Sequence, residues 1–341
     1  MKCAIALACL LAGLPAAFAE DVTAIAAKEI RSYTGRCTRI VWVRSSGGIG
    51  SPFGPNKGEA WTIMAMDTDD GGKERALIQQ RGDFHHTMIT PTGTRVIWTD
   101  GSSRVWIADW DGKNVKKLME PFLAVGVAED PHGTEWVYVD TGKKVHASNT
   151  DQIAEIVRFQ IDDLSKKELV WNKSGCNDKW EFTRDGKIGA SGLPWPNAGV
   201  VSLPNGNLLN FGVGCTPGVS GDGTLVEHMN PGGHRGVYIY NADGSNKRYI
   251  DFRVSENPAN TGEDPQFWWV SFARYDKRFM TMSGPHPSLG YKQSKGNIIF
   301  MVLNATFSGM AKYIMVTNYP EVETHAYAWI GDPTMAPAIV T

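Results

Sequence analysis

Residues that could bind a ligand or a metal stand at matching positions of a repeated pattern in this chain. The pattern is a short apolar stretch that runs into a turn, and these residues lie near the start of each stretch. Aspartate, lysine and histidine at such positions are more polar than packing requires. Aligned on the turns, the positions are His85/His86, Val125/Gly126, Asp178/Lys179, Cys215/Thr216, Trp269/Val270 and Thr324/His325.

The histidines indicate a metal site. Neutral imidazole is a ligand for zinc, manganese or iron, with bonds of about 2.1 Å. We expect His86 and His325 to share a divalent metal, with His234 or Asp178 as a further ligand. The alternative is that these histidines end strands and hydrogen-bond to backbone carbonyls. No cofactor is certain from the sequence, and a divalent metal is the one to test for.

A lysine beside these histidines could act in catalysis. If burial lowered the pKa of Lys179, its amine could accept a proton as a general base. Such a base beside a metal would suit a lyase or hydrolase that acts on carbohydrate. The chain has no Gly-x-Ser-x-Gly and no Cys-x-x-Cys motif, which argues against α/β-hydrolase and thiol-redox mechanisms.

A second candidate site is the segment 194–197, where a tryptophan stands between two prolines. The prolines stiffen the loop and hold Trp195 out of strand pairing. An aromatic ring beside Asn197 suits sugar binding, which combines stacking with amide hydrogen bonds. The alternative is that Trp195 packs inward as a plug. The same two alternatives apply to Trp268 and Trp269. Consecutive strand residues face opposite sides of a sheet, so we expect one of these rings to face the core and the other the channel.

These candidates depend on a four-strand repeat. Each repeat has a first turn just before a strand of alternating apolar residues. A second turn, usually Asp-Gly or Asn-Gly, comes later in the repeat, and these dipeptides are typical of β-hairpins. The first turns recur at intervals of 37 to 54 residues, the range of a four-strand propeller blade with loops of variable length. They begin at Thr90, Asp130, Thr183, Ser220 and, in a degenerate copy, Arg274.

The two ends of the chain predict how the ring closes. The N-terminal region supplies strands at 38–44, 61–67 and 76–80 but no inner strand, and 324–330 resembles the inner strand 84–89. Completing the first blade with the last strand removes open sheet edges. We therefore predict an all-β protein, a six-bladed β-propeller closed by a C-terminal strand that completes the N-terminal blade.

With these repeats, the chain resembles the six-bladed propellers related to TolB, which carry WD40-like repeats. The matching segments are the turn-and-strand units 90–98 and 220–226 and the outer hairpins 106–112 and 238–244. Other segments resemble exported bacterial propellers of no established activity: 192–199, 214–217 and 273–285. The resemblance implies a fold and no particular chemistry.

The first residues predict export. Lys2, the apolar run 4–17 and the small residues Ala17 and Ala19 match a signal peptide. We expect residues 1–19 to be this signal and 20–341 to form one propeller domain in the periplasm or outside the cell. No later stretch is apolar enough to insert into a membrane.

Three cysteines remain after export, at Cys37, Cys176 and Cys215. An oxidising compartment favours a disulfide, and Cys176 with Cys215 is the preferred pair because both follow a glycine in neighbouring repeats. Three separately buried thiols are the alternative.

Two functions are compatible with these features. A net charge of −2 gives no electrostatic reason to bind nucleic acid. The first function is a non-catalytic, monomeric propeller that binds a glycan or a cell-envelope protein on one face. Its candidate ligand-binding residues are Trp195, Asn197, Trp269, Lys179 and Asp178. The second is a metal-dependent carbohydrate-active enzyme that uses the histidine-lined channel.

Overall fold

The structure is a computed structural model. It describes residues 21–45, 60–79, 81–142, 152–153, 155–175, 179–204, 206–260, 264–286, 296–319 and 322–331. The expected signal peptide, Cys176 and Asp178 lie outside these residues.

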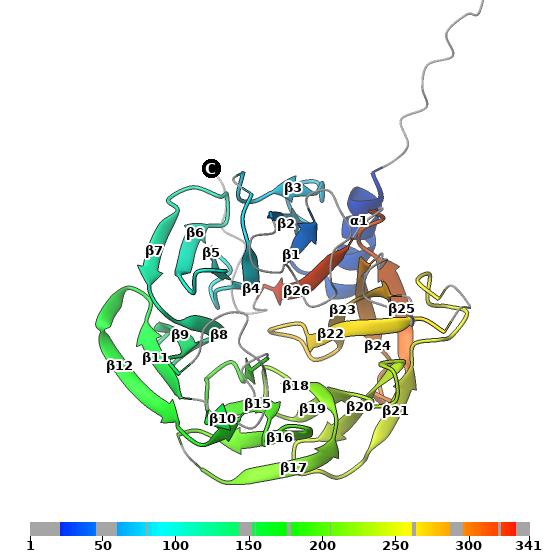
Figure 1. Cartoon of the computed structure of the whole chain (residues 1–341). Coiled ribbons are helices and arrows are strands. Elements are labelled where there is room, and N and C mark those ends of the chain that lie inside the picture. Colours follow the sequence, from blue (N-terminus) through cyan, green and yellow to red (C-terminus); the bar gives the residue numbers. More distant parts are fainter. Residues whose placement is uncertain are drawn as a thin grey trace, which may run out of the picture.

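Six four-stranded antiparallel sheets form a ring, which confirms the predicted six-bladed propeller (Figure 1). We number the blades in chain order, from the inner strand outward. Blade 1 is β26 (Glu323–Ile330), β1 (Thr38–Ser45), β2 (Trp61–Asp67) and β3 (Arg75–Ala76). Blade 2 is β4 (Phe84–Ile89), β5 (Arg95–Asp100), β6 (Val105–Asp109) and β7 (Lys116–Met119). Blade 3 is β8 (Leu123–Glu129), β9 (Glu135–Asp140), β11 (Ile156–Gln160) and β12 (Asp163–Trp171).

The remaining blades follow the same order. Blade 4 is β14 (Glu181–Phe182), β15 (Ile188–Gly192), β16 (Asn197–Ser202) and β17 (Leu208–Val213). Blade 5 is β18 (Cys215–Val219), β19 (Leu225–Met229), β20 (Gly236–Asn241) and β21 (Arg248–Asp251). Blade 6 is β22 (Gln266–Phe272), β23 (Phe279–His286), β24 (Asn297–Leu303) and β25 (Met310–Met315). A separate two-stranded sheet pairs β10 (Gln152–Ile153) with β13 (Ser174–Gly175).

The last strand closes the ring as predicted. β26 pairs antiparallel with β1, from Thr38 opposite Ile330 to Arg44 opposite Glu323. The carboxylate of Glu323 accepts hydrogen bonds from Trp42 Nε1 and Arg44 Nε, so polar contacts reinforce the seam between the two ends of the chain.

Each of the first turns of the repeat contains a hydrogen bond of the same type. The amide of the fourth residue donates to the carbonyl of the first, as from Gly93 to Thr90 and from Gly186 to Thr183. In blade 6 the equivalent bond runs from Asp276 to Ala273. The degenerate turn therefore begins at Ala273, and the alignment that began it at Arg274 was wrong by one residue.

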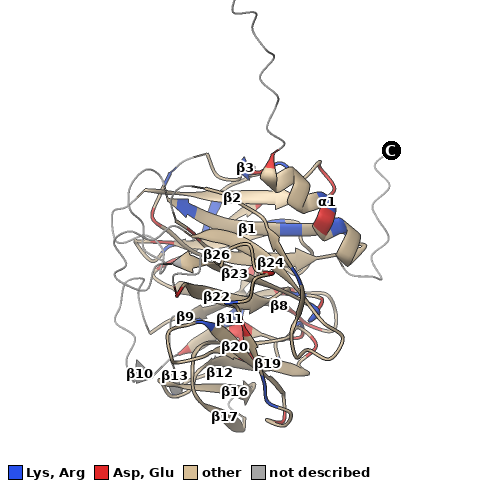
Figure 2. Ribbon diagram, turned by 90° about the vertical axis from the view of Figure 1, so that its right-hand side faces the viewer, with Lys and Arg blue, Asp and Glu red and all other residues tan. Residues whose placement is uncertain are grey.

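One helix, α1 (Val22–Thr34), precedes the first strand. The Asp21 side chain accepts a hydrogen bond from the amide of Thr23, and Gly35 ends the helix with a φ of 65°. Ala26, Ala27 and Ile30 pack against apolar side chains of blades 1 and 6. No described helix is long and apolar enough to cross a membrane. In the side view, basic and acidic residues of the described chain are interspersed (Figure 2).

Candidate functional site

The inner strands carry bulges at one end of the central channel. The strand pairing shifts near His86 in β4, Gly126 in β8, Thr216 in β18, Trp269 in β22 and His325 in β26. Four of these residues have a positive φ: 49° at His86, 47° at Thr216, 54° at Trp269 and 54° at His325. Such a conformation costs about 1–3 kcal/mol for a non-glycine residue and concentrates at functional sites.

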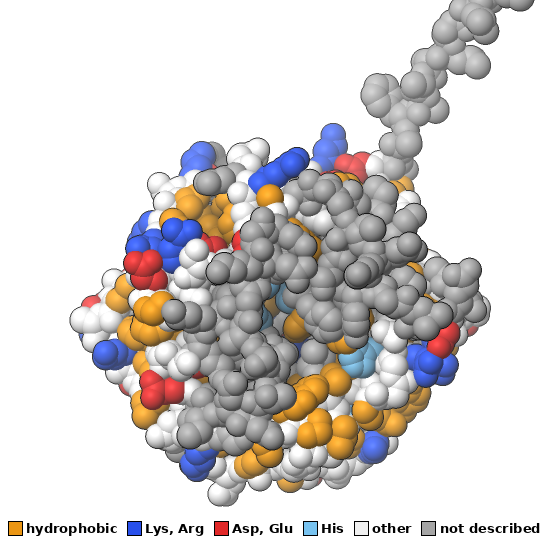
Figure 3. All heavy atoms as spheres, viewed as in Figure 1, with side chains coloured by type: hydrophobic (Ala, Val, Ile, Leu, Met, Phe, Trp, Pro, Cys, Tyr) orange, Lys and Arg blue, Asp and Glu red, His pale blue; other side chains and the backbone are white. Residues whose placement is uncertain are grey.

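Three of the bulge side chains line a central cavity of about 80 Å³, namely those of His86, Trp269 and His325. Lys179 and Gly126 also line it. The structure thus brings together the residues that the alignment on turns had placed around the channel. Histidine side chains are visible at the centre of this face (Figure 3). A cavity of this size accepts one functional group rather than a whole sugar ring.

The two channel histidines face each other. Their ring centroids are 5.8 Å apart at an angle of 62°, and the Trp269 ring lies 4.0 Å from that of His325. Burial, with the charge of His85, lowers the pKa of His86 to about 3. Burial and the charges of His86, His85 and Lys179 hold the pKa of His325 well below its usual range. Both imidazoles are therefore neutral near pH 7, and among the described residues Nδ1 of His325 has no hydrogen-bond partner.

His234 lies apart from this pair. Its ring packs on Trp268 at a centroid distance of 3.8 Å, and it does not line the central cavity. Burial lowers its pKa to about 4. In the described part of the chain, no group of three metal-ligand atoms within 4.8 Å includes a histidine. His86 and His325 thus remain a candidate pair of ligands, and the predicted further ligand Asp178 lies outside the described residues.

Lys179 is held by oxygen atoms from three blades. Its Nζ donates to the carbonyls of Thr216 and Val270 at 3.0 and 2.5 Å, and ion-pairs with Glu181 and Glu227 at 3.0 and 3.2 Å. Burial alone would lower the pKa of Lys179, but the two carboxylates outweigh it and raise the pKa. The lowered pKa on which the general-base hypothesis for Lys179 depended is therefore not found.

Glu227 is a site residue that the sequence interpretation missed. Burial raises its pKa to about 8, with Lys179 opposing and Glu181 adding to the shift. Its Oε2 has no hydrogen-bond partner among the described residues. A glutamate inside the apolar strand Leu225–Met229 was the available signal, because an acidic residue on a buried strand needs a partner.

The opposite end of the channel is closed by Arg274. Its guanidinium donates to the carbonyls of Val127, Phe182 and Thr183 on blades 3 and 4. Its backbone amide donates to the carbonyl of Ala328 on blade 1. One buried side chain from blade 6 therefore ties together blades on opposite sides of the ring. The sequence alignment had made Arg274 the first residue of a degenerate turn, and this structural role was therefore not predicted.

Trp195 lies in the turn between β15 and β16, and Asn197 is the first residue of β16. The amide of Leu193 donates to the carbonyl of Asn197, and the amide of Asn197 to that of Pro194, which fixes a tight turn. Both Trp195 and Asn197 are half-buried. Ser191 Oγ donates to the carbonyl of Lys179 at 2.8 Å, so this turn lies at the same end of blade 4 as the histidine end of the channel.

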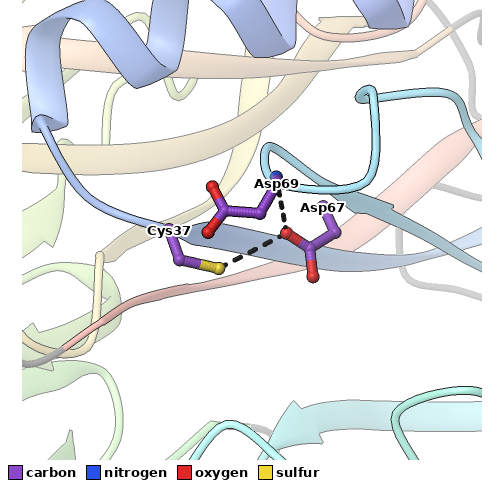
Figure 4. A group of neighbouring side chains, drawn as sticks. All are labelled: Cys37, Asp67 and Asp69. Atoms are coloured by element: carbon purple, nitrogen blue, oxygen red, sulfur yellow. Dashed lines mark hydrogen bonds between the residues drawn. The ribbon is translucent and has the colours of Figure 1, made fainter. Parts of the chain in front are cut away.

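A group of three possible metal ligands lies elsewhere, at the start of blade 1 (Figure 4). Ligand atoms of Cys37, Asp67 and Asp69 fall within 4.8 Å of one another, close enough to hold a divalent ion. However, Cys37 Sγ donates to Asp67, whose other oxygen accepts from Arg39 and Trp110. Burial and the Asp67 charge raise the pKa of the Cys37 thiol, which disfavours the thiolate that a metal needs.

The predicted partners of the disulfide are not both described. Cys176 lies outside the described residues, so the pairing of Cys176 with Cys215 stays a prediction.

Comparisons with known proteins agree on the fold alone. No protein-family model and no curated protein sequence matches the chain. A solved structure described as TolB from Agrobacterium tumefaciens aligns at a TM-score of 0.53 with 11% identity, covering 87% of this chain and 99% of that chain. The fold is that of a TolB-like propeller. An oligogalacturonate lyase in complex with manganese aligns at a TM-score of 0.45 with 9% identity, covering 80% of this chain and 95% of that chain. A likeness at that level carries no argument about activity.

Proposed function

We propose that this protein is an exported, monomeric binding propeller that holds a glycan on the histidine face of its ring. The periplasm or the cell exterior is the compartment that the N-terminal signal sequence supports. The observation that carries the proposal is the set of strained bulge residues, since His86, Trp269 and His325 are all turned into one cavity. Strained backbone conformations such as these, found here on three inner strands, cluster at functional sites.

The chemistry of the site suits recognition. A neutral imidazole offers one donor and one acceptor, which matches a sugar hydroxyl that enters the cavity. The half-buried indole of Trp195, in the turn at the same end of blade 4, supplies a stacking surface for the sugar ring. Lys179 is protonated and fully engaged, so in the described part of the site no lysine is ready to accept a proton. A cell-envelope protein is the other partner class, and the aromatic rings Trp195 and Trp269 on one face favour the glycan.

Glycan-array and affinity measurements test this proposal. Trp269→Ala removes a ring that lines the cavity, and Trp195→Ala removes one from the turn at the same end. We expect Trp269→Ala to weaken binding at least about 10-fold, because its ring packs on that of His325, and such an aromatic pair is worth about 0.5–1.5 kcal/mol beyond the area it buries. Unchanged affinity for Trp195→Ala would remove that turn from the site, and unchanged affinity for Trp269→Ala would reject the cavity itself.

A metal-dependent carbohydrate-active enzyme is the second candidate, favoured by the facing neutral imidazoles. His86 and His325 would hold a divalent ion, which would polarise a substrate oxygen when bound. Elemental analysis of the purified protein separates the candidates. About one equivalent of zinc, manganese or iron, lost in both His86→Ala and His325→Ala, would support the metal. Less than about a tenth of an equivalent after incubation with each ion would exclude it.

A further inference from the structure

A groove of about 500 Å³ lies on blade 2, at the same end as the channel histidines. Its walls come from Ile78 and residues 81–84 before and at the start of β4, and from residues around the turn between β5 and β6, among them Trp98, Gly101 and Trp106. This volume falls within the range of small-molecule sites, and it is several times that of the central cavity. On this blade, Figure 3 shows hydrophobic side chains bordered by basic and acidic ones.

Three aromatic residues line the groove: Phe84, Trp98 and Trp106. The rings of Phe84 and Trp98 meet edge to face with centroids 6.1 Å apart. Trp98 is 2% exposed, and its Nε1 has no hydrogen-bond partner among the described residues. A buried donor without a partner costs about 1–3 kcal/mol, which an oxygen acceptor on a bound molecule would recover.

The polar wall is arranged before any ligand arrives. Asp100 accepts from Arg104 Nε at 2.7 Å and from Trp106 Nε1 at 2.9 Å, so both side chains are held in place. The guanidinium of Arg104 lies 5.5 Å over the Trp106 ring and is 43% exposed. Arg81 and Asp83 complete the charged lining, so two arginines face two aspartates. The groove is therefore polar without a net charge.

The groove also adjoins the channel. Asp83 Oδ1 lies 3.2 Å from Nε2 of His85, and the His85 ring stacks on that of His86 at 6.3 Å. The carbonyl of Asp83 accepts from the amide of Gly101, and a side chain at position 101 would collide with the Asp83 carboxylate. The absence of a side chain at Gly101 thus lets Asp83 stand between the two cavities.

We propose that this groove is a second binding site, which takes a neutral pyranose oligosaccharide. Aromatic rings would stack on the apolar faces of the sugar, while aspartates accept from its hydroxyls and arginines donate to them. The carboxylates of Asp83 and Asp100 would repel an anionic ligand. A lining without net charge therefore does not favour an anion. This site goes beyond the recognition proposed at the channel, because it names a different cavity and a narrower ligand class.

Isothermal titration with cellotetraose and xylotetraose as neutral probes, and an oligouronate of the same length, tests the proposal. We expect a neutral probe to bind at least 10-fold more tightly than the oligouronate. Trp98→Phe keeps one aromatic ring and loses the donor together with part of the indole, so affinity should fall at least about 5-fold. Trp106→Ala should reduce it at least 10-fold. Tyr249→Ala, an exposed aromatic on β21 far along the chain, is the matched control and should change nothing.

The outcomes also separate this site from the channel. Trp269→Ala should leave groove affinity within 2-fold, so the groove can be supported even where the channel proposal fails. Absence of binding by both neutral probes at millimolar concentration would overturn the groove proposal. So would tighter binding of the oligouronate, or affinity unchanged in both Trp98→Phe and Trp106→Ala.

Discussion

The two ends of the central channel are built in opposite ways. At one end, Arg274 directs its guanidinium at the carbonyls of Val127, Phe182 and Thr183 and satisfies acceptors across the ring. At the other, His86 and His325 are neutral and held by strained backbone, and His325 Nδ1 is unpartnered among the described residues. Charge-assisted hydrogen bonds that join several blades stabilise a fold, whereas strained backbone clusters at functional sites. The contrast agrees with a stabilising role for the arginine end and with the binding role that we propose for the histidine end.

The largest expected effect tests the arginine end. Arg274→Met removes a buried cation that holds three carbonyls, and each hydrogen bond to a charged group is worth about 1.5–3 kcal/mol. We expect the free energy of unfolding to fall by about 3 kcal/mol or more, measured by denaturant titration. Arg278→Met, on the same turn but 57% exposed, is the control and should cost under about 1 kcal/mol. Equal losses in the two variants would contradict the role of Arg274.

The next prediction concerns the carboxylate between the two ends. The pKa of Glu227 is about 8 in the folded protein and near 4.5 when unfolded, so the folded state binds more protons between these values. Stability contributed by this residue is therefore lost as the pH rises from about 4.5 through 8. Glu227→Gln should flatten that decline in denaturant titrations at pH 6 and pH 9. A variant with the wild-type slope would show that another group titrates.

A smaller effect tests strain at the histidine end. Thr216 is β-branched with a φ of 47°, so Thr216→Gly should raise the free energy of unfolding by about 1 kcal/mol. The control Ser271→Gly lies on the inner strand β22 and is outside the positive-φ set, so it should lower stability by about 0.5–1 kcal/mol. Destabilisation of similar size in both variants would mean that the backbone at Thr216 is not strained.

The sequence predicted the ring better than its chemistry. Recurrent turns and the similarity of 324–330 to 84–89 were enough to predict six blades and their closure, because hairpin turns and strand alternation are local. The same alignment placed His86, Trp269 and His325 around one channel. Their positive φ could not be foreseen, since tertiary contacts alone impose it on such residues.

Lys179 shows where local inference failed. Glu181, close by in the sequence, and Glu227 keep its amine protonated. Glu227 and the two carbonyls that also hold the amine come from two other blades and are 37 to 91 residues away along the chain. Arg274 was missed for a related reason, since its partners lie on the far side of the ring. Electrostatic environments made by distant segments cannot be read from spacing.

One comparison of affinities tests the division of the channel most directly. The experiment applies three proteins to an array of neutral and acidic glycans: wild type, Trp269→Ala at the histidine end and Lys277→Ala at the arginine end. Thermal unfolding first confirms that each protein is folded. We expect wild type and Lys277→Ala to bind the same glycans with affinities within 2-fold. For glycans whose binding is unchanged in Trp106→Ala, and which the groove on blade 2 therefore does not hold, Trp269→Ala should lose at least about 10-fold of that affinity. Binding that is lost in Lys277→Ala and kept in Trp269→Ala, or a wild type that binds no glycan, would contradict the account.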